Sequence, residues 1–141
     1  MLDPINGTLN YVSTHRDWVV SFALVDDGVP VLAVLADPVA GRLYTAIRGR
    51  GARVEPLLKG AAGADDAAPR ALGTVKNLPL SEGMVIAHYQ LTQHAGIGRA
   101  IEASRGMRCY RTTTLEMTGV AVGGAVVYAQ PLLQPWNEIL I

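Results

Sequence analysis

The sequence lacks the features that mark a secreted or a membrane-spanning chain. Its 141 residues include a single cysteine, Cys109, so no disulfide can form within the chain, whereas small secreted domains commonly depend on disulfides. No apolar run approaches the roughly 20 residues that are needed to cross a bilayer. The first residues also have no basic region followed by an apolar one, as a signal peptide would. We therefore expect a cytoplasmic chain without a membrane segment.

An excess of charge of either sign is missing as well. The 12 Lys and Arg residues equal the 12 Asp and Glu residues in number, and the two signs are mixed along the chain. Because a nucleic-acid-binding surface needs a clustered excess of basic residues, we expect no nucleic-acid partner. Apolar residues, in contrast, make up 50% of the sequence, which is enough for the core of one domain of this length.

The first half of the chain has the pattern of an antiparallel sheet. The turn signal Asp26-Asp27-Gly28 lies between the first two apolar segments, as it does in tight hairpins. Beyond residue 56 the composition changes to small residues, so we predict a flexible loop over 57–75. Four segments rich in apolar and β-branched residues predict the strands: 18–25, 31–36, 42–47 and 52–55.

Strand and helix patterns alternate from residue 76 onward. Thr92 is expected to cap a helix that runs to about Ser104. The expected strands cover 83–89, 107–111 and 126–129, and the other expected helices cover 115–122 and the residues from 135 to the end. The sequence thus predicts one α/β domain over 1–141 with layered α+β character. Its parts are an antiparallel sheet (1–56), a loop (57–75) and an α/β half (76–141).

One stretch near the start, Asp3-Pro4-Ile5-Asn6-Gly7-Thr8, has the residues of a ligand-binding turn. Pro4 fixes one backbone dihedral angle, and Gly7 leaves the backbone open where a side chain would block a ligand. Thr8 then offers a hydroxyl and a backbone N–H at the mouth of the turn. A carboxylate, an open turn and a hydroxyl together suit an oxyanion and a hard cation.

This stretch resembles the Asp-Pro-Ile-Asp-Gly-Thr motif of the inositol monophosphatase family. The rows that follow, "DG.PVLAV..DP" and "G.LYTA..G.GA", and the segment from Thr112 to Trp136 resemble the same family in the same order. The resemblance implies an inositol monophosphatase-like fold and a small-molecule substrate. It also implies that the two carboxylates of the motif, with the carbonyl between them, hold Mg²⁺, and that the Gly-Thr end holds the substrate phosphate and the attacking water.

Three positions depart from the family pattern in the same way. Asn6, Gln130 and Asn137 stand where the resemblance implies a carboxylate, and each is the amide of matching shape. An amide oxygen carries no charge and binds a hard cation more weakly than a carboxylate does. We interpret the pocket as one that is retained in outline but has lost its cation-binding charge. We expect no metal cofactor, with Asp3 and the carbonyl of Ile5 as residual candidates for weak Mg²⁺ binding.

The resemblance covers only the middle of a family member. It implies helices before Asp3, one of which supplies a metal-binding Glu, and further strands and a helix after residue 141, so we expect a truncated member. The segments 18–25 and 31–36 are apolar on both faces, as in a sheet that is covered on both sides. An exposed apolar face of that size marks an interface, so we predict a homodimer.

Three functions remain open. The first is a biosynthetic enzyme that carries out metal-independent acid–base chemistry on a small metabolite, and the second is a weak Mg²⁺-dependent phosphatase for a sugar or inositol phosphate. The third is a non-catalytic pseudophosphatase that acts as a scaffold. Asp3, Thr8 and His88 are the catalytic candidates, since His88 ends a predicted strand where pocket residues of α/β proteins gather. The substrate-binding candidates are Asn6, Gly7, Tyr89, Gln130, Trp136 and Asn137.

Overall fold

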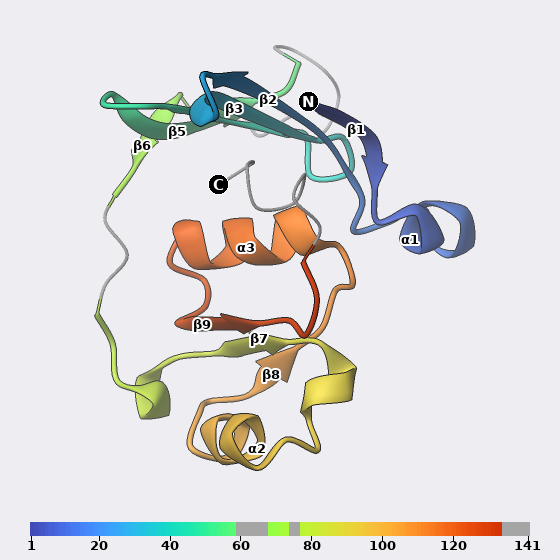
Figure 1. Cartoon of the computed structure of the whole chain (residues 1–141), viewed down its shortest axis with the longest axis vertical. Helices are drawn as coiled ribbons and strands as arrows, with labels where there is room; N and C mark the ends of the chain where they lie inside the picture. The colour runs from blue at the N-terminus through green and yellow to red at the C-terminus, as the bar shows by residue number, and fades with distance from the viewer. Residues whose placement is uncertain (59–67, 74–76, 134–141) are drawn as a thin grey trace.

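The chain folds as a stack of layers in which helix α3 (Thr113–Ala121) lies between two sheets (Figure 1). The computed structural model describes residues 1–58, 68–73 and 77–133. An antiparallel sheet forms one outer layer, and a parallel sheet lies on the other side of α3 with helix α2 (Ala95–Glu102) beyond it. The predicted fold class, an antiparallel meander followed by a strand–helix half, is confirmed.

The antiparallel sheet takes its strands in chain order, and each strand pairs with the next. The turn between the second and third strands has positive φ at Asp27 and Gly28, 45° and 76°, as a tight hairpin requires. The strands are β1 (Leu2–Asn6), β2 (Val19–Asp26), β3 (Val29–Asp37), β4 (Arg42–Ile47), β5 (Gly51–Pro56) and β6 (Arg70–Leu72).

Two elements of this half differ from the sequence-based expectation. Residues 70–72 form β6, inside the segment predicted as a flexible loop, because Ala71 pairs with Arg53 and its backbone completes the sheet edge. The strand was missed because the segment around it is rich in small residues and shows no strand pattern. The rest of the predicted loop, 59–67 and 74–76, lies outside the described residues. Helix α1 (Thr8–Ser13), which begins directly after the motif, was not predicted either.

The parallel sheet has β7 (Val85–Ala87) at its centre, between β8 (Met107–Arg108) and β9 (Val127–Ala129). The predicted N-cap at Thr92 is wrong: the Thr92 hydroxyl donates to the Tyr89 carbonyl and ends the 3₁₀ turn Tyr89–Leu91. Helix α2 begins three residues later, after His94. The final helix expected from residue 135 lies outside the described residues.

The core lies against both faces of α3. On the sheet side, Val19, Ser21 and Ala23 of β2 are fully buried. On the other side, Ile86 of β7 comes so close that a Cβ on Gly119 would lie 2.9 Å from its Cδ1. The glycine therefore allows α3 to approach the parallel sheet.

On the outer face of the antiparallel sheet, an apolar patch over β1 to β4 is open to solvent. Phe22 and Leu24 of β2 point away from α3, since their strand neighbours Ser21 and Ala23 are buried and side chains alternate along a strand. Leu2 pairs with Phe22, and Leu32, the partner of Leu24, pairs in turn with Ile47. Leu2, Phe22, Leu24 and Ile47 are 65%, 39%, 49% and 38% exposed. No helix among the described residues is long and apolar enough to span a membrane.

Candidate functional site

The motif loop, residues 3–8 at the end of β1, is held by hydrogen bonds from its own side chains. The Asp3 Oδ1 accepts the Ile5 N–H at 3.2 Å, and the Thr8 hydroxyl donates to the Ile5 carbonyl at 3.0 Å. Gly7 follows with a φ of 87°, a left-handed conformation that favours glycine. The predicted catalytic residues Asp3 and Thr8 are thus held on one turn, on either side of Gly7.

Asn6 connects this loop to the other half of the chain. Its side chain is only 7% exposed. The Nδ2 donates to the Asp3 Oδ2 at 2.8 Å, and the Oδ1 accepts the Thr114 hydroxyl of α3 at 2.9 Å. A carboxylate at this position could accept from Thr114 but could not donate to Asp3. The amide therefore makes a bridge that the family's carboxylate cannot make.

Gly7 and Asn10 pack the motif loop against the start of α3. A Cβ on Gly7 would overlap the Thr112 Oγ1. The Asn10 Nδ2 donates to the Tyr110 carbonyl at 2.6 Å and to the Thr112 Oγ1 at 3.1 Å, and the Thr112 hydroxyl donates to the Asp17 carbonyl. The close approach of two segments a hundred residues apart explains why the loop needs a residue without a side chain at Gly7.

Gln130 reaches the same end of α3 from β9. Its Oε1 accepts the Tyr128 hydroxyl at 2.7 Å, and its Nε2 donates to the Thr113 Oγ1 at 3.4 Å and to the Leu132 carbonyl at 3.1 Å. Burial raises the pKa of Tyr128 to about 12, so this phenol is protonated at neutral pH. Asn6 and Gln130, two of the predicted substrate-binding residues, therefore converge on neighbouring threonines.

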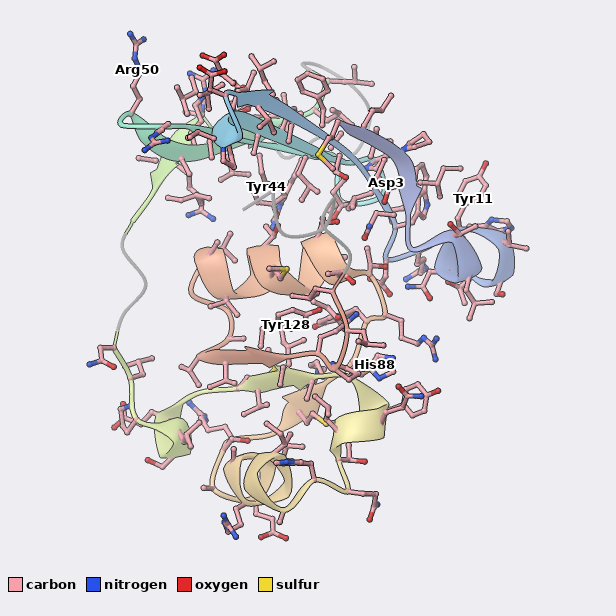
Figure 2. All side chains as sticks on the ribbon, viewed as in Figure 1. Asp3, Tyr11, Tyr44, Arg50, His88 and Tyr128 are labelled. Carbon is pink, nitrogen blue, oxygen red and sulfur yellow. The ribbon has the colours of Figure 1, made fainter. Side chains whose placement is uncertain are left out.

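His88 and Tyr89 lie where β7 ends, as the sequence predicted. The His88 Nδ1 accepts the Gln90 N–H at 3.3 Å, and the two aromatic rings lie 4.5 Å apart. The Arg111 guanidinium carbon lies 5.1 Å from the centre of the Tyr89 ring. Figure 2 shows His88 at the level of the parallel sheet and Asp3 beside the antiparallel sheet. Among the described residues no contact joins these two catalytic candidates, so the structure does not bring them together.

Sequence reasoning missed Glu116 in α3. Its side chain is 1% exposed. The Oε1 accepts the N–H groups of Tyr110 and Arg111 at 2.6 and 2.9 Å, while the Oε2 has no hydrogen-bond partner among the described residues. Burial raises the pKa of the Glu116 carboxyl, against the lowering effect of these N–H groups and of the nearby charges of His88 and Arg111. The one sequence signal was a lone acid inside a helix of small and apolar residues.

Among the described residues, the motif loop offers fewer free oxygen donors than a two-ion metal centre needs. Both Asp3 oxygens already accept N–H groups, and the Ile5 carbonyl already accepts the Thr8 hydroxyl. Within residues 1–58, 68–73 and 77–133, no group of three or more His, Cys, Asp or Glu side chains is placed to hold a metal ion. Two further predicted site residues, Trp136 and Asn137, lie outside the described residues.

The layered fold, with the motif loop held on α3, is similar to that of inositol monophosphatase family proteins of known structure. The chain belongs to the inositol monophosphatase family, whose family model matches residues 1–137. It is 27% identical to an inositol-1-monophosphatase of Bacillus subtilis over 143 residues, which cover 97% of this chain and 49% of that protein. It is 30% identical to the Nus factor SuhB of Xylella fastidiosa, covering 97% of this chain and 48% of that protein.

Solved structures agree with this assignment. A structure of SaIMPase-II with inositol monophosphate bound has a TM-score of 0.77 and 26% identity, covering 99% of this chain and 52% of that one. A calcium-bound family protein from Staphylococcus aureus has a TM-score of 0.82 at 24% identity and supports the fold alone. The chain spans about half the length of the relatives it matches. The predicted family is thus confirmed.

Proposed function

We propose that this chain carries out metal-independent acid–base chemistry on a small polar metabolite, with Asp3 as the proton-transfer group. The proposed site is the end of α3 where the motif loop and Gln130 meet, whereas His88 and Tyr89 lie apart from it at the end of β7. Thr8 lies on the exposed side of the turn, Gly7 packs against Thr112, and Asn6 and Gln130 contribute neutral amides. The free thiol of Cys109 suits a reducing compartment, so we place the chain in the cytoplasm.

One observation carries this proposal, namely the amide bridge of Asn6 between Asp3 and Thr114. In a two-ion phosphatase site, cations hold neighbouring carboxylates together and supply the charge for phosphoryl transfer. Here a neutral N–H donor at 2.8 Å holds Asp3 in its place. The loop is therefore closed by hydrogen bonds, and its geometry does not require a cation.

A weak Mg²⁺-dependent phosphatase is the second candidate. It is favoured by the relatives, one of which is named an inositol-1-monophosphatase, and by the retained Asp3 and Gly-Thr turn. Because the chain spans about half the length of such relatives, a longer polypeptide could bring further carboxylates to the loop. A non-catalytic scaffold is the third candidate, and it differs from the others in needing no proton-transfer group.

Magnesium titration separates the first two candidates. We expect calorimetry to detect no Mg²⁺ binding at millimolar concentration, with or without inorganic phosphate, because Asp3 is the one carboxylate of the motif loop and both of its oxygens already accept N–H groups. Two ions bound with micromolar affinity in the presence of phosphate would instead establish the phosphatase.

We also propose that the chain forms a homodimer through the outer face of the antiparallel sheet. The exposed Leu2, Phe22, Leu24 and Ile47 share that face, and a second copy offers a matching apolar surface about a two-fold axis. We expect light scattering to give a dimer mass at micromolar concentration and Leu24→Lys to give a monomer. Val12→Lys, on the exposed surface of α1, is the control and should leave the dimer intact. A monomeric wild type would refute the proposal.

A further inference from the structure

A short turn, residues 110–112, leads into α3 and is shaped by one buried carboxylate. Arg111 has a φ of 60°, a left-handed conformation that is unfavourable for a long side chain. The Glu116 Oε1 accepts the N–H groups of Tyr110 and Arg111 at 2.6 and 2.9 Å. Because an unfavourable backbone conformation persists only where its surroundings fix it, Glu116 determines the shape of this turn.

The same turn carries the contacts that hold the motif loop and α1. The Asn10 Nδ2 of α1 donates to the Tyr110 carbonyl at 2.6 Å. The Thr112 hydroxyl donates to the Asp17 carbonyl, and a Cβ on Gly7 would overlap the Thr112 Oγ1. A change in the shape of the turn would therefore move both residues against which the loop packs.

The Glu116 carboxyl is subject to opposing influences. Its side chain is 1% exposed, and its Oε2 has no hydrogen-bond partner among the described residues. Burial raises the pKa of this carboxyl above its usual value of 4.5, although the two N–H groups and the charges of His88 and Arg111 lower it. The protonated form therefore suits the buried position better than the ionised form does.

The titratable and charged groups that face Glu116 come from the elements packed around it. His88 at the end of β7 and Arg111 in the turn act on it as positive charges. The Tyr128 phenol of β9 lies near the same carboxyl, and the charge of Cys109, which follows β8, acts on that phenol. Burial raises the pKa of Tyr128 to about 12, so the phenol stays neutral where a glutamate titrates. Among these groups, Glu116 is the one whose side chain accepts from the backbone of the turn.

We propose that Glu116 is a positioning residue of the candidate site and that its ionisation regulates how firmly the motif loop packs against α3. The protonated carboxyl keeps an oxygen for the two N–H groups without burying a charge. Relative to an open turn with an exposed carboxyl, the packed turn is therefore stabilised below the usual glutamate pKa, and this stabilisation is lost as pH rises through the raised pKa. The inference adds regulation to the site and rests on the proposed function for its link to turnover.

Hydrogen exchange of the full chain, measured by mass spectrometry from about pH 5 to about pH 8 and corrected for the intrinsic rate, tests this inference. Within residues 8–18, the N–H groups of Tyr11, Thr14 and His15 are hydrogen-bonded, so their exchange reports opening of this segment. We expect their protection to fall as pH rises, by about tenfold for each unit by which the pKa is raised. Residues 42–56 of the antiparallel sheet should keep their protection.

Substitutions at and beside the carboxyl identify the titrating group. Glu116→Gln keeps an oxygen acceptor and carries no charge, so protection of residues 8–18 should no longer depend on pH while 42–56 stay protected. Glu116→Ala removes the acceptor and should leave residues 8–18 weakly protected at every pH. His88→Gln should move the wild-type midpoint to higher pH, because the His88 charge lowers the pKa of Glu116.

Glu102→Gln is the matched control, since it removes a carboxylate charge at the exposed end of α2. It should keep the wild-type pH profile. Protection of residues 8–18 that does not change with pH in the wild type would overturn the inference, as would a Glu116→Gln profile equal to that of the wild type. A loss of protection shared by residues 42–56 would also overturn it, because it would report unfolding of the whole chain. Exchange does not involve turnover, so a failure of the proposed chemistry at Asp3 is distinguishable from a failure of this inference.

Discussion

Replacing Asn6 with aspartate should destabilise the protein by about 2–4 kcal/mol in the absence of divalent cations. The Asn6 Nδ2 lies 2.8 Å from the Asp3 Oδ2, so the substitution replaces a donor with a second carboxylate at a position that is 7% exposed. For a domain of this size the Tm should fall by about 10 °C. Thermal unfolding of Asn6→Asp and wild type in EDTA measures the effect.

The same variant should respond to magnesium and to pH in ways that the wild type does not. A cation that binds between the two carboxylates stabilises the folded state by mass action, so millimolar Mg²⁺ should raise the Tm of Asn6→Asp more than that of the wild type. Repulsion raises the pKa of one carboxyl in the folded state. The penalty is therefore fully present at neutral pH and is lost as pH falls through that raised pKa.

Asn10→Asp is the matched control for this experiment. The Asn10 side-chain amide also donates hydrogen bonds, to the Tyr110 carbonyl and the Thr112 hydroxyl oxygen. Loss of these two hydrogen bonds should destabilise the protein by a similar amount. No second carboxylate contacts it among the described residues, and Mg²⁺ should restore nothing. If Mg²⁺ stabilises both variants equally, or if Asn6→Asp costs nothing in EDTA, the amide bridge does not replace a cation.

The parts of the fold that the sequence predicted well are those in which burial follows a local period. The strand expected over 42–47 is β4 (Arg42–Ile47) itself, and the hairpin at Asp27-Gly28 has the positive φ values that the turn residues favour. The missed β6 (Arg70–Leu72) has no apolar alternation and is a strand because an edge was available on β5. Tertiary pairing, which local pattern does not encode, decided that element.

The candidate site likewise has features that the sequence predicted and features that depend on tertiary contacts. The motif loop was recognisable because its residues are adjacent in sequence, and the amides at Asn6 and Gln130 were visible as departures from a pattern. That Asn6 donates to Asp3, or that Glu116 holds the Arg111 turn, depends on contacts made after folding. Three consecutive threonines carried no recognisable motif, although all of them are buried at the meeting point of the two halves.

Replacing Asp3 with asparagine should have the largest effect on activity. In the metal-independent acid–base reaction proposed here, a side chain has to accept or donate the transferred proton, and Asp3 is the one ionisable side chain of the motif loop. Loss of a general acid or base typically lowers the rate by about 10²- to 10⁴-fold. Turnover of a panel of small polar metabolites in EDTA, phosphorylated ones included, with wild type and Asp3→Asn compared at equal concentration, measures this.

The fold should survive this change, which makes the activity loss interpretable. An amide at position 3 keeps one oxygen acceptor and loses the other, so one of the hydrogen bonds from Ile5 and Asn6 is weakened at a cost of about 1 kcal/mol. Asp37→Asn is the control for the loss of a carboxylate charge, because the Asp37 Oδ1 accepts the backbone N–H groups of Val39 and Ala40 in the turn after β3, and an amide oxygen can accept both. It should lose no more stability than Asp3→Asn and keep full turnover. Turnover by Asp3→Asn at the wild-type rate, or wild-type turnover that appears only when Mg²⁺ is added, would instead identify a scaffold or a magnesium phosphatase.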